Sequence, residues 1–264
     1  MSDAVSVFMH PSPKIRRVAV DRPWVWLAKG WDDFRRAPGA SLPYGIAVVA
    51  ASYGIVAALA WFESVYALLP LAAGFMFLAP LLAAGLYDAS RRLALGETPD
   101  FAVTARALGR NPEHLAYMGL VLMVFNLFWT RVALLLFALF FGTPRSTVRE
   151  LVDMTLFSPD SMPFLIVGTA IGAVLATLVF AISAVSIPML LDRRDCTVWT
   201  AIATSFVAVR ENWKPMALWA ALIVAFTGFG MVPFFLGLAV TLPLIGHATW
   251  HAYKDLVVDA EPAS

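Results

Sequence analysis

Long apolar runs separated by short polar segments dominate the sequence. A bilayer core about 30 Å thick needs about 20 apolar residues per spanning helix. The last apolar run, residues 215–250, has 36 residues without Asp, Glu, Lys or Arg and is too long for one span. Gly228, Gly230 and Pro233 near its middle predict a turn. We therefore predict six spans, at about residues 43–62, 66–87, 115–141, 163–191, 214–229 and 232–250.

The composition excludes most soluble classes of protein. Hydrophobic residues make up 60% of the 264 residues, charged residues only 14%, and the mean hydropathy is +0.76. Soluble domains average roughly 45–50% apolar and about 25% charged residues. A net charge of +1 gives no basic field for a nucleic acid, and the single cysteine, Cys196, cannot form an internal disulfide. We expect an integral membrane protein whose partners are the lipid bilayer and possible further membrane subunits, with no nucleic acid and no cofactor.

The distribution of Lys and Arg predicts the orientation in the membrane. Residues 1–42 carry seven of them, and residues 88–114 and 192–214 carry four each. The turns at 63–65 and 228–232 carry none, and residues 142–162 carry two against three acidic residues. Cationic loops stay in the cytoplasm, so both termini should be cytoplasmic, in a bacterial inner membrane. We expect residues 1–20 to be a disordered tail, 21–250 to form the transmembrane domain and 251–264 to be a second tail.

A shared motif indicates that the spans repeat. Residues 70–82 and 233–245 both fit P-x3-G-x5-P-L-[LI], and residues 163–190 carry a stretched version. A proline inside a helix leaves a carbonyl without its donor and bends the helix. We therefore predict kinks at Pro80, Pro188 and Pro243.

An amphipathic stretch precedes each predicted hairpin of spans. Helices with aromatic residues on one face and basic residues elsewhere lie in the headgroup layer. The sequence thus predicts an all-α polytopic membrane protein of three hairpins, each preceded by a cytoplasmic interfacial helix, in a pseudo-threefold parallel repeat. The three apolar stripes are Trp24, Leu27, Trp31 and Phe34; Phe101, Ala105 and Leu108; and Trp199, Ile202, Phe206 and Val209.

The beginning of this pattern resembles a known family. The segment 24–44 contains W-L-A-K-G-W-D-D-F, then Pro38, Ser41-Leu42 and Tyr44-Gly45. It is similar to the opening of an uncharacterised bacterial family of predicted six-span inner-membrane proteins. Some members are labelled cytochrome c oxidase subunit I, but a haem–copper core needs many intramembrane histidines and this chain has four in total. The resemblance implies an architecture and no activity.

Three polar residues in the third span are candidates for a membrane-embedded site. Asn126 lies near the predicted mid-bilayer, and Thr130 and Arg131 follow about one turn later. Polar groups in hydrocarbon are costly, so they often mark a function. They would line a polar path or hold a ligand; alternatively, Asn126 bonds across a helix interface and Arg131 extends to the headgroups.

The histidines are weaker candidates. His247 and His251 are four residues apart, and His114 is predicted at the same membrane face. This spacing could hold a metal or a haem, but the H-E-x-x-H pattern of a zinc hydrolase is missing. Anchoring at the interface is the simpler interpretation.

These observations leave three functional hypotheses. The first is a non-enzymatic accessory, assembly or scaffolding component of a membrane complex, with a filled bundle interior. The second is a transporter of a small molecule or lipid, with a polar path at Asn126, Thr130 and Arg131. The third is a haem- or metal-binding protein that uses His114, His247 and His251. The sequence favours the first, because no catalytic motif is evident.

Overall fold

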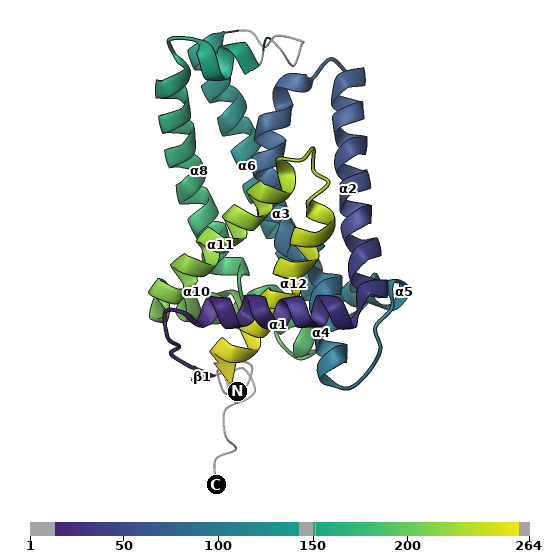
Figure 1. Cartoon of the computed structure of the whole chain (residues 1–264). Coiled ribbons are helices and arrows are strands. Elements are labelled where there is room, and N and C mark those ends of the chain that lie inside the picture. Colours follow the sequence, from purple (N-terminus) through teal and green to yellow (C-terminus); the bar gives the residue numbers. More distant parts are fainter. Residues whose placement is uncertain (1–13, 143–149, 151, 259–264) are drawn as a thin grey trace, which may run out of the picture.

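The computed structural model describes residues 14–142, 150 and 152–258, and it is a bundle of helices (Figure 1). The longer helices are α1 (Arg22–Arg36), α2 (Pro38–Trp61), α3 (Leu68–Leu82), α4 (Ala84–Ala94), α6 (Pro112–Phe141), α8 (Ser161–Ser183), α10 (Val198–Glu211), α11 (Trp213–Met231) and α12 (Leu238–Leu256). The shorter elements are η2 (Val65–Ala67), α5 (Phe101–Thr104), η3 (Ala107–Arg110), η4 (Asp153–Phe157), α9 (Ser186–Asp192) and the strands β1 (Lys14–Ile15) and β2 (Val257–Val258).

Five helices of the described chain are long and apolar enough to cross a membrane. They are Pro38–Trp61, Pro70–Ala94, Pro112–Phe141, Ser161–Asp192 and Trp213–Met231. They coincide with the first five predicted spans, which confirms an all-α polytopic fold. Most of them begin or end a few residues beyond the apolar run, because prolines such as Pro38 and Pro112 start a helix in its first turn.

The sixth predicted span corresponds to α12, which differs from the other five. This helix starts at Leu238, after a turn at 232–237, and its second half carries His247, His251, Lys254 and Asp255. Most of its residues are buried against α1, α2, α4 and α11. The helix is therefore held by protein on several sides, and a sixth crossing stays a prediction.

The α11–α12 hairpin is shorter than the helices beside it. The hydroxyl of Tyr53 in α2 donates to the carbonyl oxygen of Phe234 at the hairpin tip, at 2.8 Å. Tyr53 lies eight residues before Trp61, about 12 Å along the helix. Figure 1 accordingly shows the tip below the far ends of α2, α6 and α8. Further down, Gly45 lets the backbones of α2 and α12 touch at Ala239, where a methyl group would collide.

The predicted kinks have different outcomes. Near Pro80 the helix breaks at Ala83, between α3 and α4, and near Pro188 it breaks at residues 184–185, between α8 and α9. A proline at 188 cannot donate to the carbonyl of residue 184, so the second break lies where that bond is missing. At Pro243 α12 continues through the proline as one helix, and a bend there stays a prediction.

The helices predicted to lie in the headgroup layer occupy one end of the bundle, called here the α1 end. Helix α1 runs across the bundle axis (Figure 1), but its buried face differs from the predicted stripe. Trp26, Leu27 and Phe34 are buried, whereas Trp24 and Trp31 are exposed. The second predicted helix is broken into α5 and η3, and in α10 the aromatic residues Trp199 and Phe206 face outward. Some residues of the predicted apolar stripes therefore face outward, because packing against the other helices buries different residues.

The first described residues of the chain pack against the last described ones. Strand β1 pairs with β2 in antiparallel fashion, with Lys14 opposite Val258, and the backbone N–H of Val18 donates to the Asn212 side chain at 2.9 Å. Residues 14–20 therefore do not form a disordered tail, and α12 extends past the predicted boundary at 250 to Leu256. Residues 1–13 and 259–264 of the predicted tails lie outside the described residues.

The two copies of the shared motif, at residues 70–82 and 233–245, differ in structure. Pro70 and Gly74 lie inside α3, whereas Pro233 and Gly237 precede α12. The elements nevertheless follow one another in the predicted order. A helix at the α1 end precedes each pair of longer helices, although the second of these, α5, is short. A threefold structural repeat stays a prediction.

Candidate functional site

The three polar candidates of α6 do not form a common site. The amide oxygen of Asn126 is buried against Gly74 of α3, with no hydrogen-bond partner among the described residues. The hydroxyl of Thr130 donates to the backbone oxygen of Asn126 at 2.9 Å, so its donor is used within its own helix. Arg131 is exposed. Asn126 lies in the seam between α3 and α6, where Trp129 also donates its indole N–H to Pro70 O at 2.9 Å.

His247 lies in a closed polar contact between three helices. It is fully buried, with Nε2 2.9 Å from the Ser41 hydroxyl of α2 and Nδ1 2.8 Å from the Ser90 hydroxyl of α4. Ser41 donates its only hydroxyl proton to Ala37 O, so the Nε2–H of His247 must donate to Ser41. In the neutral ring Nδ1 then accepts from Ser90. Both nitrogens are occupied, so this histidine joins α2, α4 and α12.

His251 lies one turn further along α12, and His114 lies in the first turn of α6. His251 Nε2 is 2.8 Å from the Asp33 carboxylate of α1. Burial raises the pKa of Asp33, but the hydrogen bond and the charge of His251 lower it by more, so this pKa lies below its usual value. His114 begins α6 and contacts the Tyr117 ring. Among the described residues there is no group of three His, Cys, Asp or Glu side chains that could hold a metal.

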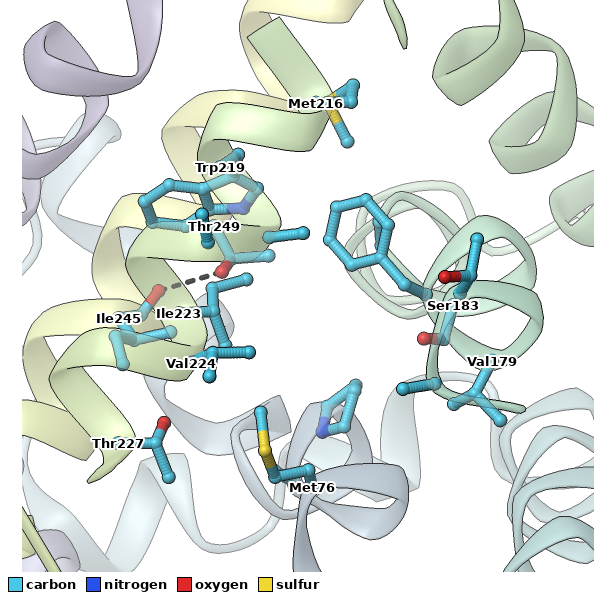
Figure 2. A pocket seen from close by; sticks show the side chains of 18 of the residues that line it. Met76, Val179, Ser183, Met216, Trp219, Ile223, Val224, Thr227, Ile245 and Thr249 are labelled. Carbon is cyan, nitrogen blue, oxygen red and sulfur yellow. Dashed lines mark hydrogen bonds between the residues drawn. The ribbon is translucent and has the colours of Figure 1, made fainter. Parts of the chain in front are cut away.

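A hollow lies elsewhere, between α3, α8, α11 and α12. This cavity has a volume of about 570 Å³ and almost entirely apolar walls. Figure 2 shows the side chains of α8 on one side and those of α11 and α12 on the other, with Met76 of α3 below them. The labelled apolar residues of the wall are Met76, Val179, Met216, Trp219, Ile223, Val224 and Ile245.

The cavity opens sideways between α8 and α11. Its rims contain exposed residues on both helices, Ala173 and Thr177 on α8 and Ala217 and Val224 on α11. Both helices are long and apolar enough to span a membrane. The opening therefore faces the hydrocarbon layer that would surround these helices.

Small side chains create this space. Ala173 and Ala176 line it from α8, and Ala217, Ala220 and Ala221 line it from α11. Larger residues at these positions would fill the gap between the two helices. At the α1 end the wall is completed by Val209 of α10 and Trp213.

One polar group in the wall has no partner among the described residues. Trp219 is buried, its indole Nε1 makes no hydrogen bond there, and its ring packs edge-on against Trp26 with centroids 5.8 Å apart. By contrast, the hydroxyl of Thr177 donates to Ala173 O. The hydroxyl of Thr249 donates to Ile245 O, and the dashed line in Figure 2 marks this second bond. A buried donor without an acceptor costs about 1–3 kcal/mol. The indole N–H is thus a buried donor in the wall that has no acceptor among the described residues.

Sequence reasoning did not find this cavity. The alanines of spans four and five suggest close helix packing as readily as an open space, and tryptophans are frequent in the chain, with nine in total. A cavity depends on how far apart two helices lie, and that distance is set by contacts elsewhere in the fold.

Comparison with known proteins finds one family model, which matches part of the chain. Residues 68–192 match the model of a family described as "Predicted integral membrane protein (DUF2189)". The match confirms the resemblance to an uncharacterised family of membrane proteins. No curated protein and no solved structure matches the chain.

Proposed function

We propose that this integral membrane protein, whose residues 68–192 carry the domain of that uncharacterised family, binds a membrane lipid by placing an acyl chain in the cavity between α8 and α11. The observation that carries the proposal is the sideways-open apolar cavity of about 570 Å³. Cavities of roughly 300–1,000 Å³ with mostly apolar walls are typical of small-molecule sites. An acyl chain is the ligand that such an opening meets first in a bilayer.

The indole of Trp219 gives the proposed site a preference. Its unpartnered N–H would donate to the ester carbonyl of a glycerolipid whose chain lies in the cavity. A pure hydrocarbon offers no acceptor and would leave this donor unsatisfied. The proposed ligand is therefore a lipid that carries a carbonyl oxygen next to its chain.

This proposal takes precedence over an accessory role and over a polar transport path. An accessory or scaffolding role was expected to go with a filled interior, which the cavity argues against. A polar transport path would need Asn126, Thr130 and Arg131 on one wall, and they do not lie on the wall of this cavity. We propose a binding role without covalent chemistry.

The proposed setting is a bacterial inner membrane, with the α1 end on the cytoplasmic side. The distribution of Lys and Arg supports this orientation, since the segments 14–36 and 88–110 both lie at the α1 end. Both described chain ends, at β1 and β2, lie there too. An even number of crossings and a parallel threefold repeat are part of the same proposal.

Filling the cavity tests the proposed function. Ala220→Phe adds a ring to the wall of α11, and Ala57→Phe adds the same ring to an exposed position of α2. The two proteins and the wild type would be purified in mild detergent, and native mass spectrometry would count retained phospholipids. We expect Ala220→Phe to lose one lipid per chain and Ala57→Phe to retain it.

A second variant separates the hydrogen bond from the volume. Trp219→Phe removes the indole N–H and keeps an aromatic ring, so the lipid should bind more weakly by roughly five- to tenfold. Equal lipid counts in the wild type and Ala220→Phe would show that the cavity holds no lipid.

A further inference from the structure

A second, independent feature lies at the α1 end, where arginines gather around one buried carboxylate. Asp88 of α4 is 1% exposed. Its Oδ1 accepts from Arg91 Nε and its Oδ2 from Arg92 Nε, both at 2.8 Å, and Arg110 Nε lies 3.8 Å from Oδ1. Three guanidinium groups from α4 and η3 therefore share one negative charge.

The surroundings add more positive charge than negative charge. Arg194, in the turn after α9, lies near enough to affect Arg110. The one further acid that contacts these arginines in the described structure is Glu97, which accepts from Arg92 Nη1 at 2.8 Å. The four arginines thus face two carboxylates, and one of these carboxylates contacts Arg92 alone.

The arginines are partly shielded from water, which strengthens their mutual repulsion. The side chains of Arg91 and Arg110 are 12% and 19% exposed. Burial lowers the pKa of Arg110, and the nearby Arg91, Arg194 and Arg92 lower it further, against the opposing effect of Asp88. Charges in such places are screened less by salt than fully exposed charges. An added anion would relieve the repulsion.

The donors for such an anion are present. Arg91 uses Nε for Asp88, and Arg110 uses Nε for the carbonyl oxygen of Leu191 at 2.9 Å. Among the described residues, no hydrogen bond is recorded for the terminal Nη groups of these two arginines. A guanidinium group holds phosphate oxygens through pairs of parallel N–H donors.

We propose that Arg91 and Arg110 form a phosphate-binding site, with Asp88 and Leu191 O positioning their guanidinium groups. The ligand is a phosphate group, supplied either by an anionic phospholipid headgroup or by free phosphate. None of the site's residues lines the cavity, so phosphate binding can be tested separately from acyl-chain binding.

The test uses full-length protein in mild detergent, with two probes. The first is inorganic phosphate, measured by the rise in melting temperature relative to sodium chloride of equal ionic strength. The second is phosphatidylglycerol, whose retention is compared with that of phosphatidylcholine by native mass spectrometry. Arg110→Gln should weaken binding of the effective probe by about tenfold or more.

Two further variants keep the result interpretable. Arg210→Gln removes an exposed arginine from α10 and should leave binding unchanged. Arg110→Lys keeps the charge without the fork of donors, so it should bind more tightly than Arg110→Gln and more weakly than the wild type.

The outcomes identify the source of the phosphate. A preference for phosphatidylglycerol without an effect of inorganic phosphate supports a headgroup site, and stabilisation by inorganic phosphate supports a site for the free ion. The proposal is overturned if neither probe acts, or if Arg210→Gln weakens binding as much as Arg110→Gln does.

Discussion

Single buried charges hold the α1 end of this protein together. Asp255, near the end of α12, accepts hydrogen bonds from Arg16, Arg22 and the indole N–H of Trp26, the last at 2.9 Å. Burial raises the pKa of Asp255, but the hydrogen bonds from Arg22 and Trp26 and the charge of Arg16 lower it by more, so it lies below its ordinary value. One carboxylate therefore fixes the chain before α1, and α1 itself, to α12.

Replacing this carboxylate should loosen the α1 end. We expect Asp255→Asn to lower the free energy of unfolding by about 1–3 kcal/mol, because the buried donors lose a charged acceptor while the partly exposed arginines regain water. A carboxylate with a lowered folded-state pKa stabilises the fold above its unfolded pKa of about 3.9, and this stabilisation is lost as pH falls through the folded pKa. Thermal unfolding in detergent at pH 7 and near pH 3 measures both effects.

The control is Asp32→Asn, which removes an exposed carboxylate of α1 that lies 3.9 Å from Arg36. An exposed ion pair contributes about 0–1 kcal/mol, so this variant should unfold close to the wild type. If both variants unfold alike, or if the wild type and Asp255→Asn keep the same difference at both pH values, Asp255 does not have this role.

At the scale of elements, the sequence predicts where helices lie better than what they touch. Each apolar run became a helix, because a backbone in lipid must form its hydrogen bonds internally. The face of α1 could not be predicted, since Trp26 is buried by Trp219 and Asp255, both more than 190 positions away. The cavity escaped prediction for the same reason, because no local pattern reports the spacing between α8 and α11.

The α11–α12 hairpin carries a prediction about depth. Its tip contacts Tyr53, about 12 Å before the end of α2, and exposes apolar residues such as Val232. We expect the tip to lie within the hydrocarbon layer, short of the far surface. In a Cys196→Ala background, an impermeant thiol reagent added from outside the cell should modify Phe62→Cys and leave Val232→Cys unmodified.

Both test positions are exposed on the protein itself, so a difference in labelling reports depth in the membrane. Because Cys196 is the one native cysteine, the Cys196→Ala background leaves each variant with a single thiol. Equal modification of the two variants would mean that the hairpin reaches the far surface as two complete spans.

At the scale of the whole molecule, the elements divide into two parts. The α1 end is closely packed and rich in hydrogen bonds, with the contacts of His247 and Asp255 joining α1, α2, α4 and α12. Towards the far end, α8 and α11 separate and leave the cavity between them. A firm base beneath an open apolar cavity is the arrangement expected of a protein that takes up a lipid chain from the side.

The most direct measurement asks whether an acyl chain enters this cavity. A phospholipid with a photoreactive group near the end of one chain would be added to the wild-type protein in a bilayer, irradiated, and the attached peptides mapped. The account predicts adducts concentrated on cavity residues such as Val179 of α8 and Ile223 of α11. Adducts spread evenly over outward residues such as Leu135 of α6, with no excess in the cavity, would contradict it.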